Sequence, residues 1–218
     1  PVYSDRDRPD LARFRELGRP FWLAGSYGTP ERLIEARAEG AAGVQVGTAF
    51  AFCEESGLRS DIKECLLEAV LKGGSRVFTD PLASPTGFPF KVVSLAQTLS
   101  EVNHYEERPR VCDLGFLRTL YRKPDGSLGY RCPAEPVDAF VRKGGDPAET
   151  QGRKCLCNCL TANVGLPQYQ SHTEYLERAL VTVGTDLPNV VRLFSPSTTR
   201  YFAKDVIEYL LTGKRRAS

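Results

Sequence analysis

The stretch most informative about the fold is residues 20–50, PFWLAGSYGTPERLIEARAEGAAGVQVGTAF. One apolar run in this stretch stops at Gly25, and a second one stops at Gly47. The helical pattern between them begins after Thr29, a good N-cap, and ends at Gly40, where a left-handed C-cap is expected. The order is therefore strand, helix, strand, and such a crossover predicts two parallel neighbours with a right-handed connection.

Both predicted strands end in glycine, and ligands bind beyond the carboxyl ends of parallel strands in this kind of fold. Glycine lets the backbone approach a ligand closely, and the amides ahead of the next helix favour an anion. In barrels of eight βα units, a phosphate commonly sits at the loops after strands 7 and 8. The pattern predicts a phosphate site at Gly25 and Gly47, although the same glycines could simply turn tight corners.

The amino-acid sequence resembles those of the nitronate monooxygenase family, formerly called 2-nitropropane dioxygenases. The resemblance starts at LAGSYGTPERLIEARAEGAAGVQVGTAFAFCEESG, residues 23–57, and continues through FTDPLASPTGFPFK, RPRVCDLG, GYRCPAEPVDAFVRKGGDP and GRKCLCN. It implies an FMN-dependent barrel enzyme that oxidises an alkyl nitronate with O2. The later phrases resemble the longer bacterial members, which carry a cysteine-containing extension. Flavin-dependent enoyl reductases of fatty-acid and polyketide synthesis share the phosphate-binding phrase, so that activity stays an alternative.

The resemblance places the phosphate of FMN against backbone amides and short side chains of six residues: Gly25, Ser26, Gln45, Val46, Gly47 and Thr48. The Thr48 hydroxyl is a candidate donor to a phosphate oxygen. Ser26 departs from the family, which usually has a second glycine there. If this position requires a positive φ, serine costs ~1 kcal/mol or somewhat more.

Only two parallel strands are evident in a chain of 218 residues, whereas a complete barrel needs eight βα units. We therefore expect the last two βα units of a TIM-type (β/α)8 barrel, in an α/β chain that is the C-terminal portion of a longer enzyme. The predicted organisation is a barrel part at 1–97, followed at 98–218 by a cysteine-containing extension and a closing helix at 203–211. The family's catalytic histidine is expected upstream of Pro1, because neither His104 nor His172 follows a buried strand.

Composition excludes several other classes of protein. The net charge of +2 is too small to argue for a nucleic-acid partner, and no apolar run approaches the ~18 to 20 residues of a membrane span. The first residues lack a secretory signal. The predicted location is the cytoplasm, and the predicted partners are a nitronate and O2, with the oligomeric state left open.

Seven cysteines form an odd set in a chain without an export signal, which argues against disulfides. Cys65 lies on the apolar stripe of a predicted helix at 61–72 and is expected in the core, and packing is also favoured for Cys53.

A sharper alternative is a metal-stabilised interaction module at 108–165, in which zinc or an iron–sulfur cluster is held by four thiolates: Cys112, Cys132, Cys155 and Cys157. The single residue between Cys155 and Cys157 is unusual for such a site, so we assign no metal ligands and leave this question open.

Overall fold

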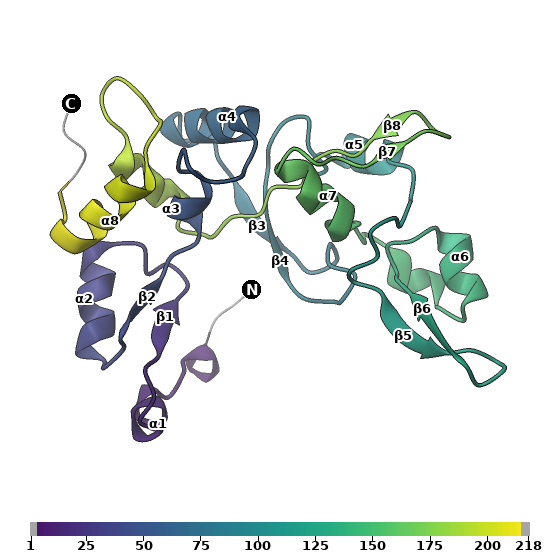
Figure 1. The fold of residues 1–218 in the computed structure, drawn as a ribbon, viewed down its shortest axis with the longest axis horizontal. Helices are drawn as coiled ribbons and strands as arrows, with labels where there is room; N and C mark the ends of the chain where they lie inside the picture. The colour runs from purple at the N-terminus through teal and green to yellow at the C-terminus, as the bar shows by residue number, and fades with distance from the viewer. Residues whose placement is uncertain (1–3, 215–218) are drawn as a thin grey trace. The chain divides into compact units, whose positions relative to one another are not determined.

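A computed structural model describes residues 4–214 of the chain. The chain divides into two compact units: unit 1 consists of Pro1–Ser75 together with Val183–Ser218, and unit 2 of Arg76–Thr182 (Figure 1). This division differs from the predicted boundary at residue 97. The last segment of the chain returns to unit 1 instead of continuing the cysteine-containing region.

Unit 1 is built around one parallel pair of strands with helices that follow them in sequence. Its elements are η1 (Asp5–Asp7), α1 (Leu11–Glu16), β1 (Trp22–Ala24), α2 (Pro30–Ala38), β2 (Gly43–Gln45), α3 (Thr48–Ala51), α4 (Ser60–Leu71), η3 (Leu187–Leu193) and α8 (Ala203–Thr212). The predicted strand, helix, strand order at 20–50 is confirmed, and β1 pairs with β2 in parallel. The helix predicted at 203–211 is confirmed as α8.

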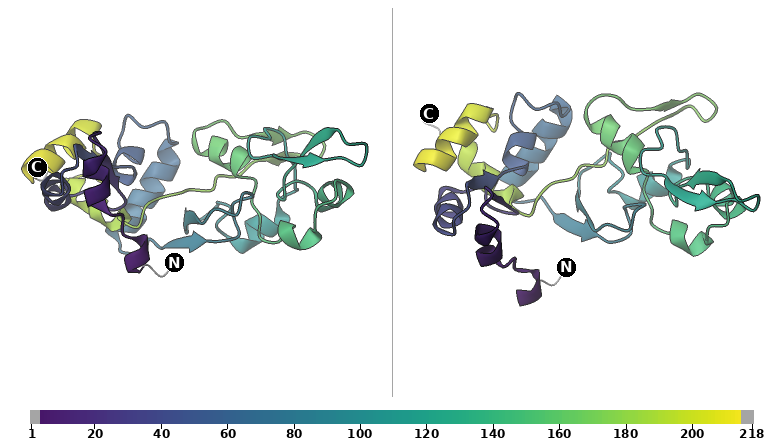
Figure 2. Two further views of the ribbon diagram at one scale, coloured as in Figure 1. Left: turned by 90° about the horizontal axis from the view of Figure 1, so that it is seen from below. Right: turned by 60° about the horizontal axis from the view of Figure 1, so that its bottom comes forward.

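The crossover helix α2 starts and ends where its sequence signals predict. The Thr29 side chain accepts a hydrogen bond from the Arg32 amide at 3.4 Å, and Pro30 occupies the first turn. Gly40 follows the helix with φ 86°, a conformation that favours glycine. Helix α8 packs against α2, and Figure 2 shows the two side by side in both views.

Helix α4 turns a different face to the core from the one predicted. Ile62, Leu66 and Val70 are buried as expected, but Cys65 is exposed, so its predicted place in the core is wrong. Lys63 is buried instead, because its ammonium group donates hydrogen bonds to three backbone carbonyls of the loop after α3, at 3.1, 3.1 and 3.4 Å. These bonds compensate the cost of burying a charge and fix the rotation of the helix.

Unit 2 has three antiparallel pairs of strands and short helices. Its elements are β3 (Val77–Asp80), β4 (Phe90–Val93), α5 (Val102–Glu107), β5 (Thr119–Arg122), β6 (Leu128–Arg131), α6 (Val137–Arg142), η2 (Pro147–Thr150), α7 (Leu156–Asn163), β7 (Tyr169–Gln170) and β8 (Tyr175–Leu176). The pairs are β3 with β4, β5 with β6 and β7 with β8. Every sheet formed by residues 4–214 has two strands, and these residues form no closed barrel.

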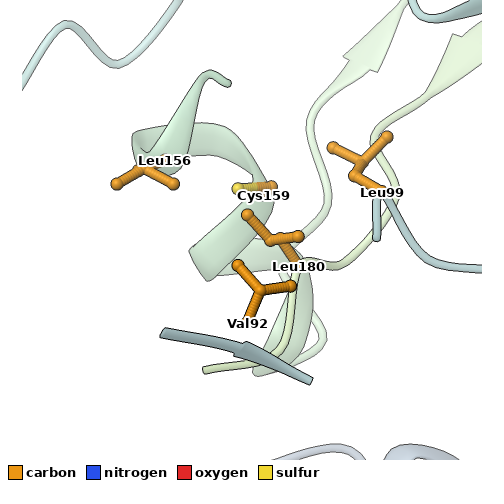
Figure 3. Close-up of a cluster of buried hydrophobic side chains, with 5 residues drawn as sticks. All are labelled: Val92, Leu99, Leu156, Cys159 and Leu180. Atoms are coloured by element: carbon orange, nitrogen blue, oxygen red, sulfur yellow. The ribbon is translucent and has the colours of Figure 1, made fainter. Parts of the chain in front are cut away.

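The core of unit 2 gathers side chains from β4, α7 and two loops. Figure 3 shows the cluster, which consists of Val92, Leu99, Leu156, Cys159 and Leu180. The segment before Val183 is tied to this core by backbone hydrogen bonds, from Val93 to the Val181 carbonyl and from Leu99 to the Ala179 carbonyl. The cluster gives a region with little regular structure its own apolar centre.

One ion pair in unit 2 is almost completely removed from solvent. The Arg108 guanidinium donates to both carboxylate oxygens of Glu177, with Nε–Oε1 at 2.7 Å and Nη2–Oε2 at 2.5 Å. Their side chains are 3% and 1% exposed. Burial alone would lower the pKa of Arg108, but the hydrogen bonds and the charge of Glu177 raise it above its usual value. The pair joins the end of α5 to the segment after β8.

Candidate functional site

The residues of the predicted phosphate site lie where β1 and β2 end. Ala24 is paired with Gln45 in the parallel register, so Gly25 and Val46 are the next residues of two neighbouring strands. Both strands run in the same direction, and both therefore leave the sheet at the same edge. The structure thus brings the two predicted segments together.

Both glycines at these strand ends face open space. A Cβ atom built on Gly25 or on Gly47 would meet no heavy atom within 4 Å. Gly25, Ser26, Gln45 and Gly47 are exposed, whereas Val46 is partly buried and Thr48 is buried. No neighbouring side chain therefore covers the backbone at Gly25 or Gly47, and a ligand can approach it closely.

The turn after β1 is strained. Gly25 has φ 87° and Ser26, its neighbour, has φ 64°. Serine rarely adopts this left-handed conformation, which costs on the order of 1 kcal/mol or more, and such residues cluster at functional sites. The positive φ that the family's second glycine would accommodate is therefore present in this chain, with serine in its place.

A third segment reaches the site from the far end of the sequence. The Gly184 amide donates to the Thr48 hydroxyl oxygen at 2.9 Å, and the Ser26 and Thr185 hydroxyls lie 3.4 Å apart. A Cβ on Gly184 would lie 2.8 Å from the Thr48 hydroxyl oxygen and 2.4 Å from an oxygen of Asp186, so only glycine fits here. This close approach holds the segment around Gly184 against the start of α3.

The Thr48 hydroxyl, predicted to donate to a phosphate, has a different partner in the structure. The Thr48 hydroxyl donates its proton to Asp186, with Oγ1–Oδ1 at 3.0 Å. The predicted donor to a phosphate is therefore already engaged, and the site contains a carboxylate. Backbone amides at the start of α3 have no acceptor within the helix and are the groups left to bind an anion.

Gly184, Thr185 and Asp186 were not among the predicted site residues. They are separated from Thr48 by more than 130 residues, and no local pattern joins the two segments. One signal was available in the sequence: Val-Gly-Thr occurs at 46–48 and again at 183–185. The two copies meet through the hydrogen bond between Gly184 and Thr48.

The histidines belong to a different unit of the chain from the site segments. His104 is on α5, with 18% of its side chain exposed, between Glu101 and Glu107. His172 is exposed in the turn that joins β7 to β8. Both belong to unit 2, and neither follows a buried parallel strand.

The cysteines of the extension do converge. Cys132 and Cys155 are buried against Ala134, with Cys112 and Cys157 packed beside them. Cys53, in unit 1, is also buried, and its thiol donates to the Phe50 carbonyl at 3.1 Å. Within residues 4–214, no three His, Cys, Asp or Glu side chains are arranged to hold a metal ion.

No family model matches the chain, and neither the curated proteins nor the solved structures include a match. In the part of the chain that the structure describes, no helix is both long and apolar enough to cross a membrane.

Proposed function

We propose that the chain holds the phosphate of FMN at the ends of β1 and β2 and forms the C-terminal part of an FMN-dependent nitronate monooxygenase in the cytoplasm. One observation carries this proposal. Two parallel strands end side by side in exposed glycine turns, with open space over Gly25 and Gly47. The resemblance of the sequence to that family suggests the activity, and the two open strand ends support a phosphate site between them.

The residues of the site fit a phosphate through their backbone. Gly47 precedes the single turn α3, whose first backbone N–H groups have no acceptor within the helix. The left-handed pair Gly25 and Ser26 turns the other strand end without placing a side chain over it. FMN, when bound, would supply the redox chemistry that passes electrons from a nitronate to O2.

Asp186 sets a condition on this binding. A carboxylate near a phosphate dianion disfavours it, so the anion must lie over the glycines, on the side away from Asp186. The hydrogen bond from Thr48 holds the Asp186 carboxylate at the start of α3. In this proposal Thr48 positions the loop and the backbone amides bind the anion.

The exposure of the strands supports the view that they belong to a larger sheet. Parallel strands are normally buried on both faces. In β1, however, Trp22 is 58% exposed and Ala24 is also exposed, and the β1–β2 pair has no third strand among residues 4–214. Further βα units beside these strands would bury both, and the catalytic base would come from those units.

The test is a titration of the 218-residue chain with FMN and with riboflavin, which lacks the phosphate, followed by flavin fluorescence. FMN should bind about tenfold or more tightly than riboflavin, and inorganic phosphate should compete. Equal affinity for the two flavins, or no binding of either, would overturn the proposal.

Gly47→Ala offers a sharp probe of the same site. Gly47 has φ −101° and a methyl group there meets nothing within 4 Å, so the variant should fold normally while the methyl enters the proposed phosphate site. Gly57→Ala is the matched control, because Gly57 also faces open space but lies in the loop after α3. FMN affinity should fall about tenfold only in Gly47→Ala.

The reaction itself is tested on a protein in which the further βα units that the proposal requires accompany this chain. Anaerobic reduction of the bound flavin by a propionate-type nitronate is expected. Reduction by NAD(P)H instead would assign the enoyl reductase alternative.

A further inference from the structure

Four of the seven cysteines meet in unit 2, although they come from three separate segments. Cys112 lies in the loop after α5, Cys132 follows β6 directly, and Cys155 and Cys157 lie at the start of α7. Cys132 is 3% exposed and Cys155 is 4% exposed, whereas Cys112 and Cys157 are partly accessible. The cluster thus contains two buried and two reachable sulfur atoms.

The loop at 115–118 presents a donor to one of the two reachable sulfurs. Arg118 folds back over Gly115, where a Cβ would come within 2.8 Å of the guanidinium carbon. Its Nε then donates to the Cys112 sulfur at 3.4 Å and its Nη2 to the Cys112 carbonyl at 2.7 Å. Negative charge on the Cys112 sulfur is therefore stabilised by this loop.

The four sulfurs belong to one cluster, in which Cys112 interacts with Cys132 and Cys157 with Cys155. A hydrogen bond from the Cys132 thiol lowers the pKa of Cys112 to about 6, with further help from Arg118 and against the charge of Glu135. A hydrogen bond from the Cys155 thiol lowers the pKa of Cys157 to about 6 in the same way. The donating thiols have raised pKa values, since each keeps its proton beside a thiolate and is buried. These shifts favour the thiolate form of Cys112 and Cys157 and the thiol form of Cys132 and Cys155.

We propose that Cys112 and Cys132 form a peroxide-reactive dithiol, in which Cys112 is the attacking thiolate and Cys132 the resolving thiol. Cys112 is the better nucleophile site because a guanidinium group contacts its sulfur directly and it is partly accessible to solvent. The resolving sulfur is adjacent and shielded. This site lies in unit 2 and does not depend on flavin binding.

The chemistry balances with one hydroperoxide as the oxidant. The Cys112 thiolate attacks a peroxide oxygen, the O–O bond breaks, and the leaving oxygen takes a proton and departs as water or an alcohol. The Cys132 sulfur then attacks the sulfenic acid on Cys112, and the S–O bond breaks. The hydroxide leaves as water with the proton of the Cys132 thiol. The two sulfurs together lose two electrons, which the peroxide accepts.

The experiment uses the reduced 218-residue chain, treated with equimolar hydrogen peroxide and mapped by peptide mass spectrometry. A Cys112–Cys132 disulfide is expected. In Cys132→Ser, the sulfenic acid on Cys112 should persist and be trapped by dimedone. Because Cys132 is buried, Arg118→Gln is a second variant that keeps all thiols, and it should slow the oxidation of Cys112 about tenfold. Cys65→Ser is the control, since Cys65 is exposed on α4 of unit 1 and its loss should change nothing.

Three outcomes would overturn the proposal. The first is labelling of Cys65 by dimedone as readily as Cys112. The second is an unchanged oxidation rate in Arg118→Gln. The third is one tightly bound zinc ion per purified chain that protects all four sulfurs from peroxide, because the cluster would then be a tetrathiolate metal site.

Discussion

Removal of the Arg108 guanidinium is expected to cost far more than removal of any surface charge in the same unit. In Arg108→Met the Glu177 carboxylate, with its side chain 1% exposed, loses both of its guanidinium hydrogen bonds. The methionine side chain fills most of the volume of the arginine, so the main loss is electrostatic. The variant leaves a buried charge without its partner.

The size of the effect follows from the burial of the pair. At a charge separation of about 4 Å and an effective dielectric constant of about 20, the lost attraction is about 4 kcal/mol. Breaking such a buried pair by removing one partner costs about 3–5 kcal/mol. In Arg108→Met combined with Glu177→Leu, no charge is left buried, and the cost relative to the original pair should fall to about 1 kcal/mol or less.

Urea unfolding followed by circular dichroism measures these differences. With a slope of about 2 kcal/mol per molar urea, the single variant should lower the midpoint by about 1.5–2.5 M. Hydrogen exchange of peptides covering 177–182 provides a local measurement, because this segment is bonded to β4. Arg142→Met is the control: Arg142 pairs with Asp138 on α6, both are 69% exposed, and its loss should cost about 0.3–0.5 kcal/mol.

A double variant as unstable as the sum of its two single variants would refute this reasoning. So would equal effects of Arg108→Met and Arg142→Met. Either result would mean that burial of the ion pair does not determine its contribution to the free energy of unfolding.

Three further predictions concern other parts of the chain. Ser26→Gly should be more stable than Ser26→Ala by about 1 kcal/mol in urea unfolding, because both lose the hydroxyl but only glycine relieves the positive φ; equal stability would contradict the strain. Lys63→Met should lower the free energy of unfolding by about 2–3 kcal/mol through the loss of three charged hydrogen bonds, whereas Lys72→Met, on the exposed end of α4, should change it by less than about 0.5 kcal/mol in the same assay. The pKa values of Cys112 and Cys157 are lowered from 9.0 to about 6, so unfolding midpoints measured under reducing conditions should rise from pH 6 to pH 9 and lose this contribution as the pH falls through about 6. A variant with serine at both positions should lose that slope, and an unchanged slope would assign it to other groups.

The strand, helix, strand unit could be predicted because its signals are local. Thr29 and Gly40 bound the helix through contacts with residues a few positions away, and two apolar runs flank it. The pairing of β1 with β2 then follows from the short crossover. The prediction that the turns at Gly25 and Gly47 lie at the same edge of the sheet required no long-range information.

The rest of the site could not be predicted, because it depends on contacts between distant segments. Asp186 accepts a hydrogen bond from Thr48, but the whole of unit 2 separates the two residues in the sequence. Its carboxylate adds a negative charge to the site. The error at Cys65 has a similar origin. The apolar stripe of α4 allowed two rotations of the helix, and the carbonyls that accept hydrogen bonds from Lys63 decided between them. The convergence of Cys112, Cys132, Cys155 and Cys157 was available from the sequence only as an alternative, because these cysteines come from three separate segments that carry no periodic pattern.

The discontinuity of unit 1 has a consequence for how the chain is made on the ribosome. Unit 2 is continuous and can fold as soon as Thr182 has emerged. The helices α2, α3 and α4 pack on η3 or α8, which are synthesised only after unit 2. Their apolar faces therefore stay uncovered while unit 2 is being made, and during that interval the nascent chain depends on chaperones more than a chain with contiguous units would.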